Sequence, residues 1–266
     1  MMPRRRLDVR VVELGLAESR SRAQALVMAG RVTVDGAVVD KAGAPVADDQ
    51  LVEVVAPPRY VSRGGEKLET ALRAFAIDVT GERCLDVGAS TGGFTDCLLQ
   101  HGAEHVLAVD VGRAQLHERL RADPRVTVLD GVNARSLAPG MLPYRAGFVT
   151  ADVSFISLRT VLPAVVGCLA ERWRGVVLVK PQFEAGRERV RKGVVREPEV
   201  HAEVLHHVAA AAESLGVTVL GVCDSSLPGP AGNREFLMEL ASAGHPLTTD
   251  QDVDLDRAIR HAVGSR

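Results

Sequence analysis

Aromatic residues are scarce in this sequence: they make up only 3% of its 266 positions, although hydrophobic residues reach 46%. A core of ordinary size must therefore be built mainly from Val, Leu and Ala. Cysteine is scarce as well, and the cysteines form no CxxC pair and have no histidine at zinc-ligand spacing. This usage argues against a zinc site and a disulfide framework and is typical of a reducing compartment. The four residues are Cys84, Cys97, Cys168 and Cys223.

Long apolar runs are also missing. None approaches the roughly 18 residues that a membrane helix needs, and the N-terminus lacks the apolar segment of a signal peptide. We therefore expect a cytoplasmic protein that does not associate with membranes.

The net charge of −2 points to no class of partner, but the charges are unevenly distributed. A local basic surface is typical of nucleic-acid binding, and the alternative is a solvated surface without a partner. Only Asp8, Glu13 and Glu18 oppose the early arginines, which are Arg4, Arg5, Arg6, Arg10, Arg20, Arg22 and Arg31.

Residues 7–56 carry the pattern of a small α+β unit. We expect a short helix that is capped by Asp8 and runs to Leu14. A second helix over residues 20–29 should be capped by Ser19, and a glycine follows each helix. The sequence therefore predicts two short helices at the start of this unit.

A β-hairpin should follow around Asp35-Gly36, and residues 51–55 should add a strand. Ala56-Pro57-Pro58 is a stiff break in the chain. We therefore divide the chain into an RNA-binding domain at 1–56, a linker at 57–63 and a large domain at 64–266.

In the large domain, short Val- and Leu-rich runs alternate with helical stretches, and the segment after residue 247 has a helical pattern. This alternation predicts an α/β fold with a parallel sheet covered by helices on both faces. The expected strands are residues 84–87, 105–109, 126–129, 148–151, 176–179, 217–222 and 235–240.

The string CLDVGASTGGFTDCLL, residues 84–99, places a glycine-rich turn between a strand and a helix. Its spacing is not that of a dinucleotide site, and Asp86 at the strand end favours a partly cationic ligand. Asp110 ends the next strand, where a carboxylate can accept both ribose hydroxyls of an adenosine. Asn133 follows the third strand and is placed to bind the adenine edge. Together they predict a nucleoside-type cofactor site.

Further polar residues stand at strand ends, where open α/β sheets place their chemistry. Asp152 follows one strand in the string ADVSFISL, and Lys180 follows another in VKPQFEAG. Glu235 stands at the start of a late strand, and Lys67 lies in the helical stretch RGGEKLETAL. A buried strand delivers Lys180, which favours a functional role over that of an ordinary surface lysine.

Lys67, Asp152, Lys180 and Glu235 match the catalytic Lys-Asp-Lys-Glu tetrad of ribose 2′-O-methyltransferases related to FtsJ. The strings SRGGEKL, LDVGASTGGFTD, ADVSFISL, VKPQFE and GNREF extend the match, so the chain resembles the hemolysin A (TlyA) family of ribosomal RNA 2′-O-methyltransferases. The resemblance implies S-adenosylmethionine as the cofactor and a Rossmann-like sheet of seven mostly parallel strands.

By this resemblance the cofactor is bound by the glycine-rich turn and the strand ends. Two positions depart from the relatives: Asn133 replaces an aspartate of FtsJ proteins, and Tyr60 replaces a tryptophan found in some relatives. The resemblance places Gly88, Gly92, Phe94, Asp110, Asn133 and Asp152 at the cofactor, and the turn adds Asp86, Ser90 and Gly93.

The string LDVRVVELGLAESRSRAQALVMAGRVTVDG, residues 7–36, resembles the small RNA-binding domain named after ribosomal protein S-four. In that domain the second helix and the following turn lie on RNA. We therefore expect ribosomal RNA or ribosomal subunits as partners of a monomeric protein. The expected contacts are Arg20, Arg22, Gln24 and Arg31, joined by Arg4 and Arg6 of the basic N-terminal stretch.

A ribose hydroxyl is a poor nucleophile and a sulfonium is an excellent leaving group, so transfer depends on in-line placement and proton removal. We expect Lys180 to be the base, Lys67 to be the nearby cation that favours its neutral form, and Asp152 and Glu235 to orient the amines. No metal is required.

Three alternatives stay open at this point: a membrane-lytic hemolysin, an RNA-binding protein without methyltransferase activity, and a methyltransferase acting on protein or small molecules. The missing membrane span and secretion signal argue against the hemolysin. The intact tetrad argues against a protein without methyltransferase activity, and the RNA-binding domain argues against a protein or small-molecule substrate.

Overall fold

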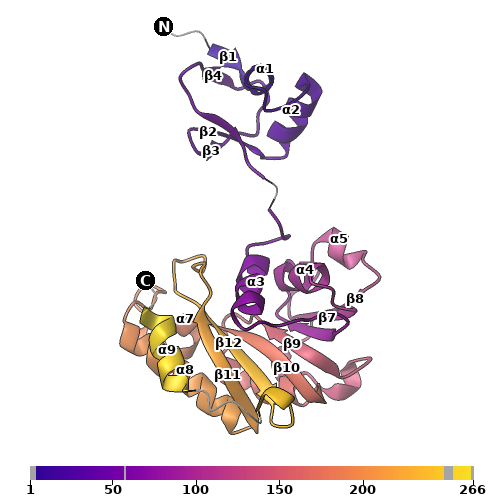
Figure 1. Cartoon of the computed structure of the whole chain (residues 1–266), viewed down its shortest axis with the longest axis vertical. Coiled ribbons are helices and arrows are strands. Elements are labelled where there is room, and N and C mark those ends of the chain that lie inside the picture. Colours follow the sequence, from indigo (N-terminus) through magenta and orange to yellow (C-terminus); the bar gives the residue numbers. More distant parts are fainter. Residues whose placement is uncertain (1–3, 57, 249–253, 265–266) are drawn as a thin grey trace. The chain divides into compact units, whose positions relative to one another are not determined.

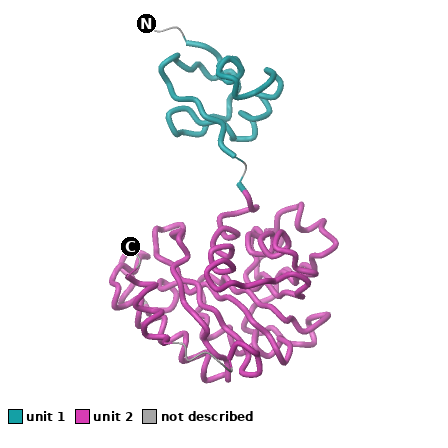
Figure 2. The backbone as a smooth tube through the Cα atoms, in the orientation of Figure 1, with its two compact units in different colours: residues 1–58 teal, residues 59–266 magenta. Residues whose placement is uncertain are grey.

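The structure is a computed structural model that describes residues 4–56, 58–248 and 254–264. It divides into two compact units, residues 1–58 and 59–266 (Figure 2). Pro57, the centre of the expected break, lies outside the described residues. Each unit is described by itself.

Within residues 4–56, unit 1 contains the two expected helices, α1 (Leu7–Glu13) and α2 (Arg20–Met28) (Figure 1). The hairpin is confirmed, since Asp35 and Gly36 both take positive φ angles between two paired strands. The three-stranded sheet has the order β3-β2-β5, and β1 pairs antiparallel with β4; these two short strands were not expected. The strands are β1 (Arg4–Arg6), β2 (Val32–Val34), β3 (Ala37–Val38), β4 (Pro45–Ala47) and β5 (Val52–Val54).

The prediction that Asp8 caps the first helix is wrong. Helix α1 begins at Leu7, directly after β1, so Arg6 occupies the cap position and Asp8 lies inside the first turn. Asp8 is completely buried there, although it carries a carboxylate. The second cap is confirmed: the Ser19 hydroxyl accepts the backbone N–H of Arg22 at 3.2 Å.

Unit 2 is built on a seven-stranded sheet with the order β11-β12-β10-β9-β6-β7-β8. All neighbours run parallel except β12, which is antiparallel to both β10 and β11. The expected seven-stranded, mostly parallel sheet is therefore confirmed. Its strands are β6 (Arg83–Val87), β7 (His105–Asp110), β8 (Val126–Asp130), β9 (Ala146–Ala151), β10 (Leu169–Val179), β11 (Val217–Asp224) and β12 (Phe236–Ser242).

Helices cover both faces of this sheet. On one face Leu85 and Val87 pack with residues of α6, α8 and α9, and on the other Cys84 packs with residues of α3, α4 and α5. The helices are α3 (Gly64–Ala74), α4 (Gly93–Gln100), α5 (Glu118–Arg121), α6 (Leu158–Val166), α7 (Pro181–Glu184), α8 (Pro198–Glu213) and α9 (Leu255–Gly264).

The described part of this unit also has short 3-10 turns: η1 (Ala134–Ser136), η2 (Pro139–Met141), η3 (Arg187–Arg189) and η4 (Pro246–Thr248). Among the described helices, none has both the length and the apolar character needed to cross a membrane.

Candidate active site

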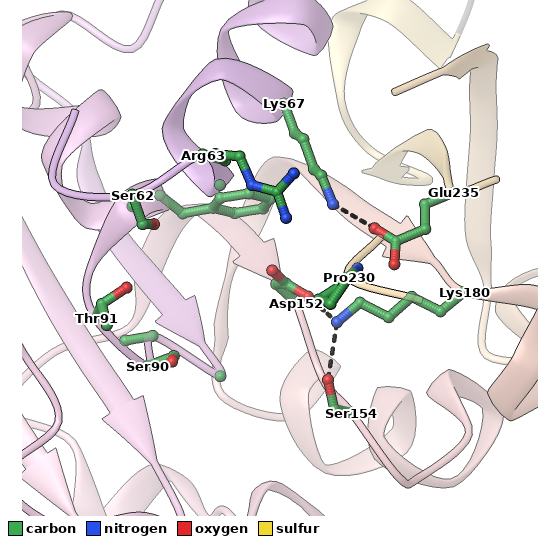
Figure 3. Close-up of a pocket in the computed structure, with 15 residues that line it drawn as sticks. Ser62, Arg63, Lys67, Ser90, Thr91, Asp152, Ser154, Lys180, Pro230 and Glu235 are labelled. Carbon is green, nitrogen blue, oxygen red and sulfur yellow. Dashed lines mark hydrogen bonds and ion pairs between the residues drawn. The ribbon is translucent and has the colours of Figure 1, made fainter. Parts of the chain in front are cut away.

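The register of the sheet gathers the expected polar residues at one edge. Val87 pairs with Ala151, and Val179 pairs with Phe236, so the residues just beyond these positions emerge side by side. Asp152 follows β9, Lys180 follows β10, and Glu235 precedes the antiparallel strand β12. Lys67 reaches the same edge from α3 (Figure 3).

Each lysine of this group has its own carboxylate. The ammonium of Lys67 donates to Oε2 of Glu235. The ammonium of Lys180 lies 2.5 Å from Oδ1 of Asp152 and donates to the Ser154 hydroxyl at 2.9 Å. Side-chain exposure is 10% for Lys67, 11% for Lys180 and 1% for Glu235, whereas Asp152 keeps 26%. The site thus contains two ion pairs, one more deeply buried than the other.

These ion pairs line a cavity of about 300 Å³. Arg63 reaches into the same space, as Figure 3 shows. This arginine was not predicted, although it belongs to the string SRGGEKL that carries Lys67. Other lining residues that were missed are Ser62, Gly64, Ala89, Thr91, Ser154 and Pro230.

A second cavity, of about 600 Å³, adjoins the first and shares Asp152 and Ser154 with it. Asp110 lines it, and its carboxylate accepts the backbone N–H groups of Ser90 at 2.8 Å and Gly112 at 2.6 Å. Asn133 lines it as well and caps η1. Gln115 and Arg135 add two more polar groups to the lining. Much of the remaining wall is apolar, with Val109, Val111, Val132, Ala134, Val153, Phe155 and Ile156. Apolar walls with a few placed polar groups suit a nucleoside.

The glycine-rich turn borders both cavities. Gly88 lines each of them and has a φ of +83°, and an added Cβ there would collide with the Asp152 carbonyl oxygen. A side chain at this position would therefore push β6 and β9 apart at the point where the cavities meet. Ser90 also lines both cavities, and Gly93 and Phe94 line the first.

Two residues expected at the cofactor lie behind the cavity walls instead. Asp86 is fully buried, and its carboxylate accepts the hydroxyls of Thr95 at 2.6 Å and Thr150 at 2.9 Å. Burial raises the pKa of Asp86 to about 6. Gly92 is in the left-handed region, and a side chain there would collide with Leu120. Both residues therefore support the conformation of the glycine-rich turn without lining either cavity.

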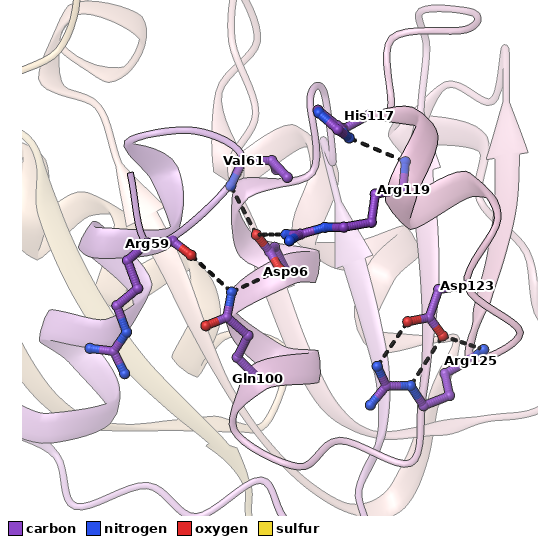
Figure 4. A network of polar contacts seen from close by, with 8 residues as sticks. All are labelled: Arg59, Val61, Asp96, Gln100, His117, Arg119, Asp123 and Arg125. Carbon is purple, nitrogen blue, oxygen red and sulfur yellow. Dashed lines mark hydrogen bonds and ion pairs between the residues drawn. The ribbon is translucent and has the colours of Figure 1, made fainter. Parts of the chain in front are cut away.

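Residues 59–63, expected in the linker, are held on unit 2 by Asp96 (Figure 4). The Asp96 carboxylate accepts the Val61 N–H at 2.8 Å and a guanidinium N–H of Arg119 at 2.7 Å. Gln100 donates both to Asp96 and to the Arg59 carbonyl, each at 3.0 Å. Tyr60 is 2% exposed, and an added Cβ at the nearby Gly65 would collide with its ring. This anchorage places the following residues at the cavity wall.

The RNA contacts expected in unit 1 fall into two groups. Arg6, Arg20 and Gln24 converge on the buried Asp8. The others are separate: Arg31 donates to the Val55 carbonyl at 2.6 Å, and Arg4 and Arg22 are exposed. In the part of the chain that the structure describes, no three His, Cys, Asp or Glu side chains are grouped so as to hold a metal ion.

Comparison with known proteins assigns both units. Residues 60–241 match the family described as FtsJ-like methyltransferase, and residues 5–52 match the S4 domain. The chain is 50% identical over 243 residues to the 16S/23S rRNA (cytidine-2'-O)-methyltransferase TlyA of Mycobacterium tuberculosis, covering 90% of this chain and 91% of that protein. It is 41% identical to Hemolysin A of Brachyspira hyodysenteriae over 234 residues, which cover 87% and 98% of the two chains.

A solved structure from Streptococcus thermophilus superposes on this chain with a TM-score of 0.75 and 42% identity, covering 100% of this chain and 96% of the other. The resemblance noted in the sequence is thereby confirmed over both units. The chain belongs to the FtsJ-like methyltransferases and, with its S4 domain, to the TlyA/hemolysin A family of ribosomal RNA 2′-O-methyltransferases.

Proposed function

We propose that this protein methylates the ribose 2′-hydroxyl of cytidine in ribosomal RNA. The observation that supports this most directly is that two cavities meet at Asp152. Asp110 and Asn133 line the cavity on one side, and two lysine–carboxylate pairs line the cavity on the other. Cytidine and ribosomal RNA are proposed as the substrate because the relative with 50% identity is named a 16S/23S rRNA (cytidine-2'-O)-methyltransferase.

The family implies S-adenosylmethionine as the cofactor. Asp110 and Asn133 would hold its adenosine in the second cavity, and Gly88 and Ser90 would border it at the junction. Asp110 is already fixed by two backbone N–H groups, so little reorganisation is needed on binding. When bound, the cofactor supplies an electrophilic methyl group on a sulfonium.

Lys180 is the better placed of the two lysines to take the hydroxyl proton. It contacts Asp152 and Ser154, which line both cavities, whereas Lys67 pairs with the more deeply buried Glu235. Lys180 would accept the hydroxyl proton, and Asp152 would stabilise the ammonium that results. Lys67 and Glu235 hold the ribose end of the first cavity in shape.

Unit 1 supplies affinity for ribosomal RNA or ribosomal subunits, because its arginines can neutralise phosphates. The enzyme would then act in the cytoplasm, as a monomer and without a metal. The sequence expectations for Lys67, Asp152, Lys180 and Glu235 as catalytic residues stay predictions.

The test uses unmodified 16S and 23S ribosomal RNA transcripts with radiolabelled S-adenosylmethionine. We expect label at a defined cytidine, and we expect no label when a 2′-deoxycytidine is ligated in at that position. Asp152→Asn, which keeps the shape of the side chain, should abolish transfer. Label that survives the deoxy substitution would show base methylation and would overturn the proposal.

A further inference from the structure

The buried carboxylate of unit 1 has no place in the methyl transfer. Asp8 is completely shielded from solvent, yet it accepts hydrogen bonds from three side chains. Arg6 donates through Nε and Nη2 at 3.0 Å each, a two-pronged contact, while Arg20 Nε donates at 3.0 Å and Gln24 Nε2 at 2.8 Å. The hydrogen bonds from Arg6 keep the pKa of Asp8 well below its usual range, although burial opposes them.

The two arginines are exposed while their shared partner is not. Side-chain exposure is 51% for Arg6 and 56% for Arg20, against 0% for Asp8. A guanidinium has five N–H donors, and these contacts use two of Arg6 and one of Arg20. On each arginine the edge between Nη1 and Nη2 keeps donors that a phosphate can accept in a two-pronged contact.

Two guanidinium groups this close to one carboxylate would otherwise repel each other. One buried negative charge between them lowers that repulsion. Its two contacts fix the plane of the Arg6 guanidinium, and its contact with Nε restrains Arg20, so less side-chain entropy is lost when an anion binds. The arrangement carries a net charge of +1 and is assembled from β1, α1 and α2.

We propose that Asp8 is a positioning residue of the RNA-contact surface: it presents Arg6 and Arg20 as a preset pair that binds neighbouring phosphates of the RNA backbone. This inference rests on the proposed function, because the phosphates are those of the ribosomal RNA substrate. Gln24 completes the carboxylate's hydrogen bonds and holds α2 to α1.

The experiment exploits a difference in sign. Asp8→Asn removes a negative charge, so a surface that acted through net charge alone would bind RNA more tightly. If Asp8 instead positions the two arginines, Asp8→Asn should bind 23S ribosomal RNA transcripts at least tenfold more weakly than the wild type. The slope of log affinity against log salt should also fall in magnitude by about 1 to 2, since each lost phosphate contact removes about one. Asp49→Asn, at an exposed carboxylate of the same unit, is the matched control and should bind equally or slightly better.

A second pair of variants covers the case in which Asp8→Asn fails to fold. Arg20→Lys keeps the charge but loses the planar fork, and it should weaken binding. Arg5→Lys is the matched control and should not weaken binding, because Arg5 is also exposed but pairs with Glu13 instead of Asp8. Tighter binding by Asp8→Asn, or equal affinity of the two lysine variants, would overturn the inference. If the wild-type chain neither binds nor methylates ribosomal RNA, the proposed function fails instead.

Discussion

Replacing Lys180 separates a proton acceptor from a fixed charge. Lys180→Ala should slow single-turnover methyl transfer by 10²- to 10⁴-fold, the usual effect of removing a general base, equivalent to about 3 to 5 kcal/mol. The structural cost is smaller. Asp152 loses its ion pair but keeps 26% exposure, so water can solvate it, and the loss of stability should lie between about 1 and 3 kcal/mol.

Lys180→Arg is the sharper variant. A guanidinium can keep the contact with Asp152 but cannot give up its proton, so this variant should be stable, should bind S-adenosylmethionine normally and should be nearly as inactive as the alanine variant. Ser154→Ala is the control: it removes one neutral hydrogen bond from the same amine, worth about 1 kcal/mol, and should slow transfer tenfold at most. Single-turnover rates at saturating RNA and cofactor measure all three. An arginine variant that keeps more than a tenth of the wild-type rate would show that Lys180 only positions charge.

Three further outcomes are expected. Lys67→Met leaves the buried carboxylate of Glu235 without its partner, so it should lower the free energy of unfolding by about 3 to 5 kcal/mol in urea titrations. The double variant with Glu235→Gln should recover most of this loss. If it does not, the broken ion pair is not the cause of the lost stability. Asp110→Ala should weaken S-adenosylmethionine binding by roughly ten- to a hundredfold in calorimetry, and wild-type affinity would remove Asp110 from the site. Because the pKa of Asp86 is raised to about 6, its protonated form stabilises the fold below about pH 4, and this contribution is lost as pH rises through 6. Relative to Asp86→Asn, the wild type should therefore lose about 3 kcal/mol between pH 4 and pH 7, and a difference that stays constant with pH would contradict the assignment.

The strands and the residues at their ends could be predicted because their signals are local. A buried run of Val and Leu followed by one polar residue identifies Asp152 and Lys180, and the parallel direction of the strands brings such residues to one edge. Glu235 could be found because it stands at the start of a late strand, which begins one residue later than predicted, at Phe236. It reaches the same edge because this strand is antiparallel to its neighbours.

Local sequence is not enough where distant segments decide the outcome. Asp8 has the local sequence of a helix cap, and only the pairing of β1 with β4 moves the helix start ahead of it. Asp86 ends its strand as a ligand residue would, yet hydroxyls from Thr95 and Thr150 enclose it. Arg63 lines the cavity because Asp96, some thirty positions away, anchors the chain before α3.

The antiparallel direction of β12 keeps part of the lining of the first cavity separate from that of the second. Because β11 arrives at this edge and β12 departs from it, one connection, residues 225–235, carries both Pro230 and Glu235 into the first cavity. The second cavity draws none of its lining from that connection. Insertions or exchanges within residues 225–234, which leave Glu235 in place, should therefore alter the lining of the first cavity without changing that of the second.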